Sequence, residues 1–146
     1  MKIIYFYKIG NFFYKKRVPL IPKLCDILIR LLFNSVVYSR TNIGKNCTFA
    51  YGGIATVIHP LTIIGDDVLI SQSVTIGGKS GNKNLPVIGN NVYISAGAKV
   101  LGPIKVGNNA IIGANAVVIH DVPDNAVVVG IPAKIIKYNI NISELK

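Results

Sequence analysis

Two histidines are the side chains of this 146-residue sequence best suited to proton transfer near neutral pH, where imidazole titrates. His59 follows an aliphatic residue in Val57-Ile58-His59-Pro60, at a position that is usually small elsewhere in the chain. We interpret it as a general base, and the alternative is a turn histidine held by the backbone. His120, before Asp121-Val122-Pro123, is interpreted as a surface corner residue.

A six-residue repeat surrounds His59 and extends through most of the chain from Ile43 onward. A helix repeats every 3.6 residues and an ordinary strand every two, so neither explains this spacing. It predicts a β-solenoid in which three hexads close a triangular coil of about 18 residues, with about five coils before Ala133. The inward residues would be Ile58, Ile64, Ile70, Ile76, Ile88, Ile94, Val100, Val106, Ile112 and Val118.

Two interruptions of the repeat mark candidate sites, because a regular solenoid needs neither of them. Residues 79–86 are polar and basic, and Asn82 stands where an inward aliphatic residue is expected. We predict that this segment is a loop ejected from the coil. Three extra residues between Phe49 and Ile58 predict a bulge near Tyr51-Gly52-Gly53.

The first 40 residues have a helical period instead. Leu24, Ile27, Leu28, Leu31 and Leu32 recur at the spacing of an amphipathic helix, whose apolar stripe we expect to cap the open end of the solenoid. A shorter helix is expected from Ile3 to Tyr14. The sequence therefore predicts a mostly β protein: a helical segment over 1–40, a solenoid over 41–134 and a tail over 135–146.

Most of the positive charge falls in the same N-terminal segment. The chain has 16 basic and 6 acidic residues, a formal charge of +10, and residues 1–45 contain nine of the basic residues and one acid. A basic amphipathic segment favours peripheral contact with an anionic membrane face. No nucleic-acid-binding motif is present, so no nucleic-acid partner is expected. With no signal peptide, we expect a cytoplasmic protein, at the inner membrane face if the segment binds lipid.

Four repeat segments carry a family resemblance: residues 73–78 (SVTIGG), 94–102 (ISAGAKVLG), 112–118 (IGANAVV) and 129–134 (VGIPAK). Over residues 40–137 the chain resembles bacterial hexapeptide-repeat acyltransferases, and it looks closest to their serine O-acetyltransferase branch. That branch includes short members thought to acetylate surface polysaccharides. The resemblance implies a left-handed parallel β-helix, a homotrimer, acetyl-CoA bound in grooves between subunits, a histidine base and no metal.

The resemblance also implies a set of cofactor-binding residues. Small residues would line the edge on which the pantetheine arm lies, and lysines would neutralise the phosphates of CoA. The positions that match are Gly77, Gly78, Lys79, Ala96, Ala114 and Lys134.

Two histidines of the serine acetyltransferase branch are absent here. The Asp-His pair of that branch matches Tyr51-Gly52, the His-Gly-Gly of its short members matches Tyr51-Gly52-Gly53, and a second family histidine matches Leu85. We therefore assign the catalytic role to His59 and acceptor contacts to Tyr51, Gly52 and Gly53. The alternative for Tyr51 is a packing aromatic.

We predict an acetyl-CoA-dependent O-acetyltransferase that modifies a sugar hydroxyl of a surface polysaccharide or its precursor. A serine O-acetyltransferase is the first alternative, disfavoured by Tyr51-Gly52 and Leu85. The second alternative is a non-catalytic solenoid scaffold that binds a partner.

Overall fold

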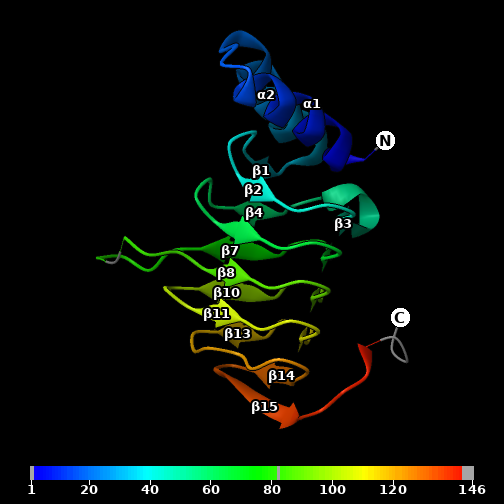
Figure 1. Ribbon diagram of the computed structural model, residues 1–146, viewed down its shortest axis with the longest axis vertical. Helices are drawn as coiled ribbons and strands as arrows, with labels where there is room; N and C mark the ends of the chain where they lie inside the picture. The colour runs from blue at the N-terminus through cyan, green and yellow to red at the C-terminus, as the bar shows by residue number, and fades with distance from the viewer. Residues whose placement is uncertain (1, 82, 143–146) are drawn as a thin grey trace.

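The computed structural model describes residues 2–81 and 83–142, so Asn82 and residues 143–146 of the predicted loop and tail lie outside the described residues. The chain forms a parallel β-solenoid with a helical hairpin at its N-terminal end (Figure 1). Helices α1 (Ile3–Lys15) and α2 (Leu20–Phe33) form this hairpin, and strand β15 (Ala133–Lys137) lies at the opposite end. The predicted fold class is confirmed.

Three sheets form the walls of the solenoid, and each consists of very short strands. Sheet A contains β1 (Val36–Val37), β4 (Val57–Ile58), β7 (Thr75–Gly77), β10 (Lys99–Leu101) and β13 (Val117–Val118). Sheet B contains β2 (Asn42–Ile43), β5 (Ile63–Ile64), β8 (Val87–Ile88) and β11 (Lys105–Val106). Sheet C contains β3 (Thr48–Phe49), β6 (Leu69–Ile70), β9 (Tyr93–Ile94), β12 (Ile111–Ile112) and β14 (Val127–Gly130), and β15 pairs antiparallel with β14.

The chain visits the sheets in the order A, B, C, and four coils from β1 to β12 are complete. The fifth coil has β13 and β14, but only an isolated bridge between Val106 and Val122 stands in place of a strand in sheet B. The expected number of about five coils is reached when this incomplete coil is included.

The six-residue repeat places one aliphatic side chain of each strand inside the solenoid. Parallel pairing aligns Ile58 with Ile76 and Val100 with Ile76, so these side chains stack along the axis. All three are fully buried. Burying one aliphatic side chain of this size stabilises the fold by about 1.5–3 kcal/mol.

Asparagines hold one corner of the coils together. Asn91, Asn109 and Asn125 adopt left-handed backbone conformations, which asparagine tolerates better than most residues. The side-chain nitrogen Nδ2 of Asn91 donates to Asn109 Oδ1 at 2.8 Å, and Nδ2 of Asn109 donates to Asn125 Oδ1 at 2.9 Å. These side-chain hydrogen bonds link successive coils at a corner, outside the stack of buried aliphatic side chains.

Helix α1 covers the open end of the solenoid, where the apolar stripe of residues 24–32 was expected to lie. Ile3, Ile4 and Tyr7 join the solenoid core, and the Tyr7 hydroxyl donates to the Thr41 carbonyl at 2.7 Å and accepts from the Ile43 N–H at 3.1 Å. Along the described residues no helix combines the length and apolarity needed to cross a membrane.

Helix α2 buries a different face from the one expected. The covered residues are Pro22, Cys25, Ile29 and Phe33, whereas the predicted stripe is largely exposed at Leu24, Ile27, Leu31 and Leu32. Both faces are apolar, so helical periodicity alone does not choose between them. The packing of α1 determines which face is buried. Gly10 of α1 lies so close to the Cys25 face of α2 that a Cβ at Gly10 would be 3.0 Å from the Cys25 Cβ.

Candidate functional site

The candidate site residues lie along two edges of the solenoid that flank sheet A. The edge between sheets A and B, the A–B edge, carries His59, Gly77 and the loop that begins at Gly78. The edge between sheets C and A, the C–A edge, carries the short helical turn η1 (Ala50–Gly53) together with Ala96 and Ala114. The loop projects from one side of the solenoid and η1 from the other (Figure 1).

His59 lies at the corner that follows β4, one coil before the ejected loop. Its backbone N–H donates to the Ile76 carbonyl at 2.8 Å, and its carbonyl accepts from the Thr62 N–H at 3.0 Å. Its side chain is half-buried, and Nδ1 accepts a hydrogen bond from the backbone N–H of Leu61 at 3.2 Å. A neutral imidazole that accepts at Nδ1 carries its proton on Nε2. The ring therefore stabilises the corner as an Asn or Asp side chain does in an Asx turn.

The predicted loop is present between β7 and β8, and its end folds back onto its beginning. A Cβ at Gly78 would lie 2.9 Å from Leu85 Cδ2, so the Leu85 side chain closes over Gly78. Leu61, Ile63, Lys83 and residues 84–87 line a shallow hollow beneath the loop on sheet B. Leu85, which the resemblance matches to a family histidine, is one of the residues that line this hollow.

Packing within the chain would allow a side chain at Gly77. A Cβ built there would have no atom within 4 Å, and the residue lies in a regular strand. The missing side chain leaves the backbone at the end of β7 open to solvent. Close approach of another backbone or of a ligand is a recognised reason for a glycine inside a strand.

The C–A edge contains the predicted bulge, which takes the form of η1. Tyr51 and Gly52 have left-handed backbone conformations, and the Tyr51 side chain is 82% exposed, so it does not pack within the chain. Gly53 is buried, and a Cβ there would lie 2.5 Å from Ile3 Cγ2. The Gly53 carbonyl accepts from Ser35 Oγ at 2.7 Å. Gly53 therefore has a structural role at the contact with α1.

Ala96 and Ala114 lie on the C–A edge in successive coils. The Asn115 N–H donates to the Ala96 carbonyl at 2.9 Å, which stacks the two corners. Ala114 is exposed and Ala96 is half-buried. Within one chain, sheet A therefore lies between these two alanines and the residues Gly77, Gly78 and Lys79.

Gln72 is a candidate that sequence reasoning missed. It lies on the C–A edge in the corner between those of Tyr51 and Ala96, and its carbonyl accepts from the Gly97 N–H at 3.0 Å. Its Oε1 atom is buried and has no hydrogen-bond partner among the described residues. A buried acceptor without a partner is costly, so a donor from a ligand would satisfy it. No sequence signal separates Gln72 from other polar corner residues.

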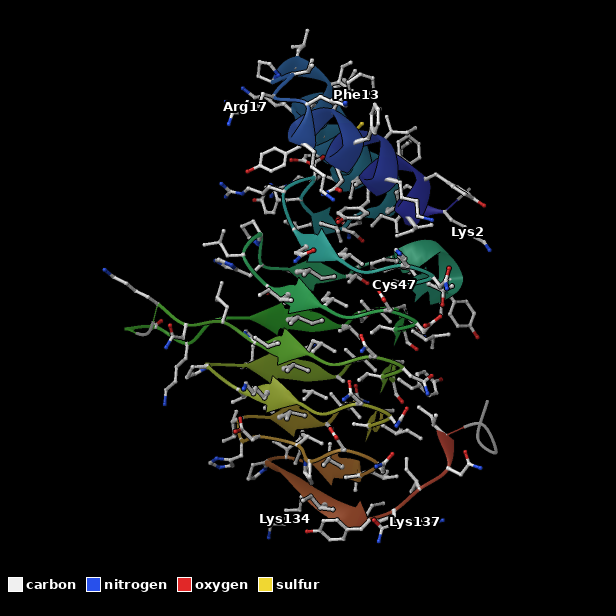
Figure 2. The ribbon with its side chains drawn as sticks, in the orientation of Figure 1. Lys2, Phe13, Arg17, Cys47, Lys134 and Lys137 are labelled. Carbon is white, nitrogen blue, oxygen red and sulfur yellow. The ribbon has the colours of Figure 1, made fainter. Side chains whose placement is uncertain are left out.

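Lys134 and His120 lie nearer the C-terminal end of the solenoid. Lys134 is exposed on β15 at the C-terminal end (Figure 2). Lys79 lies in the loop of the third coil. His120 is exposed, as expected for a surface corner residue, and lines a hollow with Asp121, Lys134 and Tyr138.

The two cysteines have no role in the site. Both are free and buried, and burial raises the pKa of the Cys47 thiol and of the Cys25 thiol. The Cys47 thiol donates to the Gly65 carbonyl at 3.1 Å. A raised pKa keeps a thiol protonated and therefore weakly nucleophilic. Over the described ranges no cluster of three His, Cys, Asp or Glu side chains is arranged to hold a metal ion.

The three-walled coil, the six-residue repeat and the ejected loop define the class as hexapeptide-repeat transferases. The family model described as "Bacterial transferase hexapeptide (six repeats)" matches residues 86–120. A solved serine acetyltransferase from Brucella abortus superposes with a TM-score of 0.87 at 28% identity, covering 93% of this chain and 56% of its own. A serine acetyltransferase in complex with CoA superposes with a TM-score of 0.82 at 32% identity, covering 92% of this chain and 55% of its own.

Sequence relatives narrow the class to one family. The serine acetyltransferase of Synechococcus elongatus is 42% identical over 89% of this chain and 54% of its own length. That of Helicobacter pylori strain J99 is 40% identical over 89% of this chain and 77% of its own length. This chain belongs to the serine acetyltransferase family. It spans between 54% and 63% of the length of six of the curated relatives it matches.

These relatives correct the predicted acceptor. A polysaccharide O-acetyltransferase was expected because the histidines of the serine branch are absent at Gly52 and Leu85. That prediction is wrong, since the relatives at 37–42% identity and the solved neighbours are serine acetyltransferases. The absence of these two side chains therefore does not exclude the chain from the serine acetyltransferase family.

Proposed function

We propose that this chain is an acetyl-CoA-dependent O-acetyltransferase whose acceptor is serine. The observation that carries the proposal is the 40% identity to a serine acetyltransferase of which the chain covers 77%. Solved relatives include one in complex with CoA and a soybean enzyme complexed with serine, which superposes with a TM-score of 0.83.

The working unit in this proposal is a homotrimer. The candidate residues divide between two edges on opposite sides of sheet A, and one chain does not join them. A neighbouring subunit that brings its C–A edge against the A–B edge of this one would unite Gly77 and His59 with Tyr51 and Gln72. Acetyl-CoA would then lie against the open backbone at Gly77, where no side chain blocks its approach.

His59 is the general base in this proposal. The serine hydroxyl oxygen attacks the thioester carbonyl carbon while the imidazole takes the hydroxyl proton. The carbon–sulfur bond of the tetrahedral intermediate then breaks, and the imidazolium returns the proton to the departing thiolate. A base that acts through Nε2 must carry its own proton on Nδ1, so the Leu61 N–H must first leave Nδ1. Losing that hydrogen bond costs about 1 kcal/mol.

A binding subunit without catalysis is the second candidate. It is favoured by Gly52 and Leu85 at the positions of the family histidines, and by the engagement of His59 Nδ1 with the backbone. Such a subunit would retain the groove for CoA and lack turnover.

One experiment separates these functions. Release of CoA from acetyl-CoA is followed with a thiol reagent, with and without serine, and CoA binding is measured by calorimetry on the same preparation. Release that depends on serine supports the acetyltransferase. CoA binding without release under any condition supports the binding subunit. Absence of both release and binding overturns both candidates.

A further inference from the structure

Helix α2 is apolar on two sides, and the chain covers only one of them. A second stripe runs along the exposed side through Leu20, Leu24, Ile27 and Leu31, and Leu20 and Leu31 are each 75% exposed. A helix that is apolar all round is normally buried all round. Within residues 2–81 and 83–142, no element packs over this second stripe.

The stripe continues at the turn between the two helices, which points away from the solenoid (Figure 1). We call residues 12–20 the tip. Exposed side chains of the tip include Phe12, Tyr14, Val18 and Leu20. Between them stand Lys15, Lys16 and Arg17, all exposed, and Lys16 Nζ lies 5.9 Å from the centre of the Phe12 ring. The tip therefore mixes aromatic, aliphatic and basic side chains on one protruding surface, where Figure 2 shows Arg17 directed away from the protein.

No acidic side chain of the hairpin offsets these charges. Asp26 is the one acid among the first 40 residues, and its Oδ1 accepts from the Ser39 N–H at 2.7 Å and from the Ser39 hydroxyl at 2.6 Å. This carboxylate is thus directed toward the solenoid. Lys8, Lys23 and Arg30 are also exposed, so cations lie on the outer surface of both helices as well as at the tip.

We propose that the helical hairpin docks, tip first, on the surface of an anionic lipid bilayer. Phe12, Leu20 and Leu24 enter the boundary between head groups and acyl chains, while Lys15, Lys16 and Arg17 contact lipid phosphates. Attachment is peripheral, since neither helix is long and apolar enough to span the membrane. The solenoid is held away from the bilayer, because the tip lies at the far end of the hairpin.

Other occupants fit the surface less well. A second copy of the chain would cover the apolar stripe, but it would bring two strongly basic hairpins together without an acid on either outer surface. A nucleic acid would use the charges and leave the stripe exposed. A bilayer containing anionic lipid pairs the cations of the tip with lipid phosphates and takes up the part of the stripe nearest the tip, at Leu20 and Leu24.

The test uses the full chain and sedimentation with vesicles of phosphatidylcholine, with or without phosphatidylglycerol. We expect binding to the anionic vesicles alone, weakened by added salt. The triple variant Lys15→Gln/Lys16→Gln/Arg17→Gln should bind at least about tenfold more weakly, because each cation near an anionic surface strengthens binding roughly fivefold. Its matched control, Lys134→Gln/Lys137→Gln at the opposite end, should bind as the parent does.

The apolar half of the proposal has its own variants. Leu20→Gln/Leu24→Gln should weaken vesicle binding at least about tenfold, whereas Ile131→Gln, equally exposed at the other end, should not. The chain contains no tryptophan, so a single Phe12→Trp reports insertion by a blue shift with anionic vesicles, and Tyr138→Trp should show none.

Three results would overturn the proposal. They are equal binding of the parent to neutral and anionic vesicles, no binding to either, and no blue shift at position 12. If Leu20→Gln/Leu24→Gln instead reduced the oligomer measured by light scattering, the stripe would belong to an interface between copies. If the basic variant lost binding to duplex DNA while vesicle binding was unchanged, the tip would be a nucleic-acid surface.

Discussion

The Nδ1 atom of His59 accepts a hydrogen bond from the backbone N–H of Leu61, two residues further along the chain, at 3.2 Å. This contact gives the histidine a structural role at its corner, and the contact must break before Nε2 can act as a base. The two roles make different demands on the side chain, because the corner needs only an acceptor and a base needs an imidazole. Variants of His59 can therefore separate them.

Replacing His59 by Asn should abolish turnover without loosening the fold. The Asn Oδ1 atom can accept the Leu61 N–H, so the free energy of unfolding should change by less than about 0.5 kcal/mol. Loss of a general base should lower kcat at least about 100-fold. His59→Ala should lower kcat similarly and also destabilise the fold by about 1 kcal/mol. Serine-dependent turnover that survives in His59→Asn would exclude His59 as the base; His120→Asn serves as the surface control.

Replacing Gly77 by Val should block CoA and leave the fold intact. A Cβ at this position meets no atom within 4 Å, and a β-branched residue suits a strand, so the free energy of unfolding should change by less than about 0.5 kcal/mol. The Kd for CoA should rise at least about tenfold, because the new side chain occupies the open edge of β7. Calorimetry and thermal melting measure the two effects. Unchanged CoA affinity would remove Gly77 from the cofactor site.

Replacing Gly53 by Ala, in contrast to the Gly77 substitution, should destabilise the fold. Its backbone φ of +87° disfavours a side chain, and the added Cβ would lie 2.5 Å from Ile3 Cγ2. We expect a loss of about 2 kcal/mol in the free energy of unfolding, measured by urea denaturation. A fold as stable as the parent would show that α1 yields at this contact without strain.

Replacing Gln72 by Met should stabilise the protein and weaken acceptor binding. The substitution removes a buried oxygen that has no partner within the described ranges, which should add about 1 kcal/mol to the free energy of unfolding. If serine donates to that oxygen, its KM should rise about tenfold while the Kd for CoA stays unchanged. A stabilised variant with the parent KM would show that Gln72 does not contact the acceptor.

Alkaline pH should destabilise the fold through Tyr7. Burial raises the pKa of its hydroxyl above the ordinary value of 10.0. Between the two values the folded chain retains a proton that the unfolded chain has lost, so the stabilisation is complete below pH 10 and is lost as pH rises toward the folded pKa. Cys47, whose pKa is also raised, adds a loss that begins near its ordinary value of 9.0.

Tyr7→Phe is the variant that isolates this effect. It should unfold more easily at neutral pH, because the hydrogen bonds to Thr41 and Ile43 are gone, yet its stability should decline less steeply above pH 10. Urea denaturation across the alkaline range gives both quantities. Parallel declines in Tyr7→Phe and the parent would assign the alkaline loss to other groups.

The sequence predicted the solenoid, the ejected loop and the bulge because the repeat is a local property. One aliphatic residue every six positions determines which side chain points inward, and its interruption at residues 79–86 determines where a loop must leave the coil. The sequence also shows that the family histidines are missing at Gly52 and Leu85, but the acceptor predicted from their absence is wrong. An absent residue does not say what replaces its chemistry.

Tertiary structure decided what depends on contacts between distant segments. The sequence alone determined the β-solenoid and its helical lead-in, since both follow from periodicity. Only the packed chain showed that α2 buries Cys25 and Ile29 rather than Leu24 and Leu31, because α1 is what covers it. Only the three-dimensional structure showed that sheet A lies between Gly77 and Ala96. The edge on which a residue lies depends on how many strands and corners precede it in the chain.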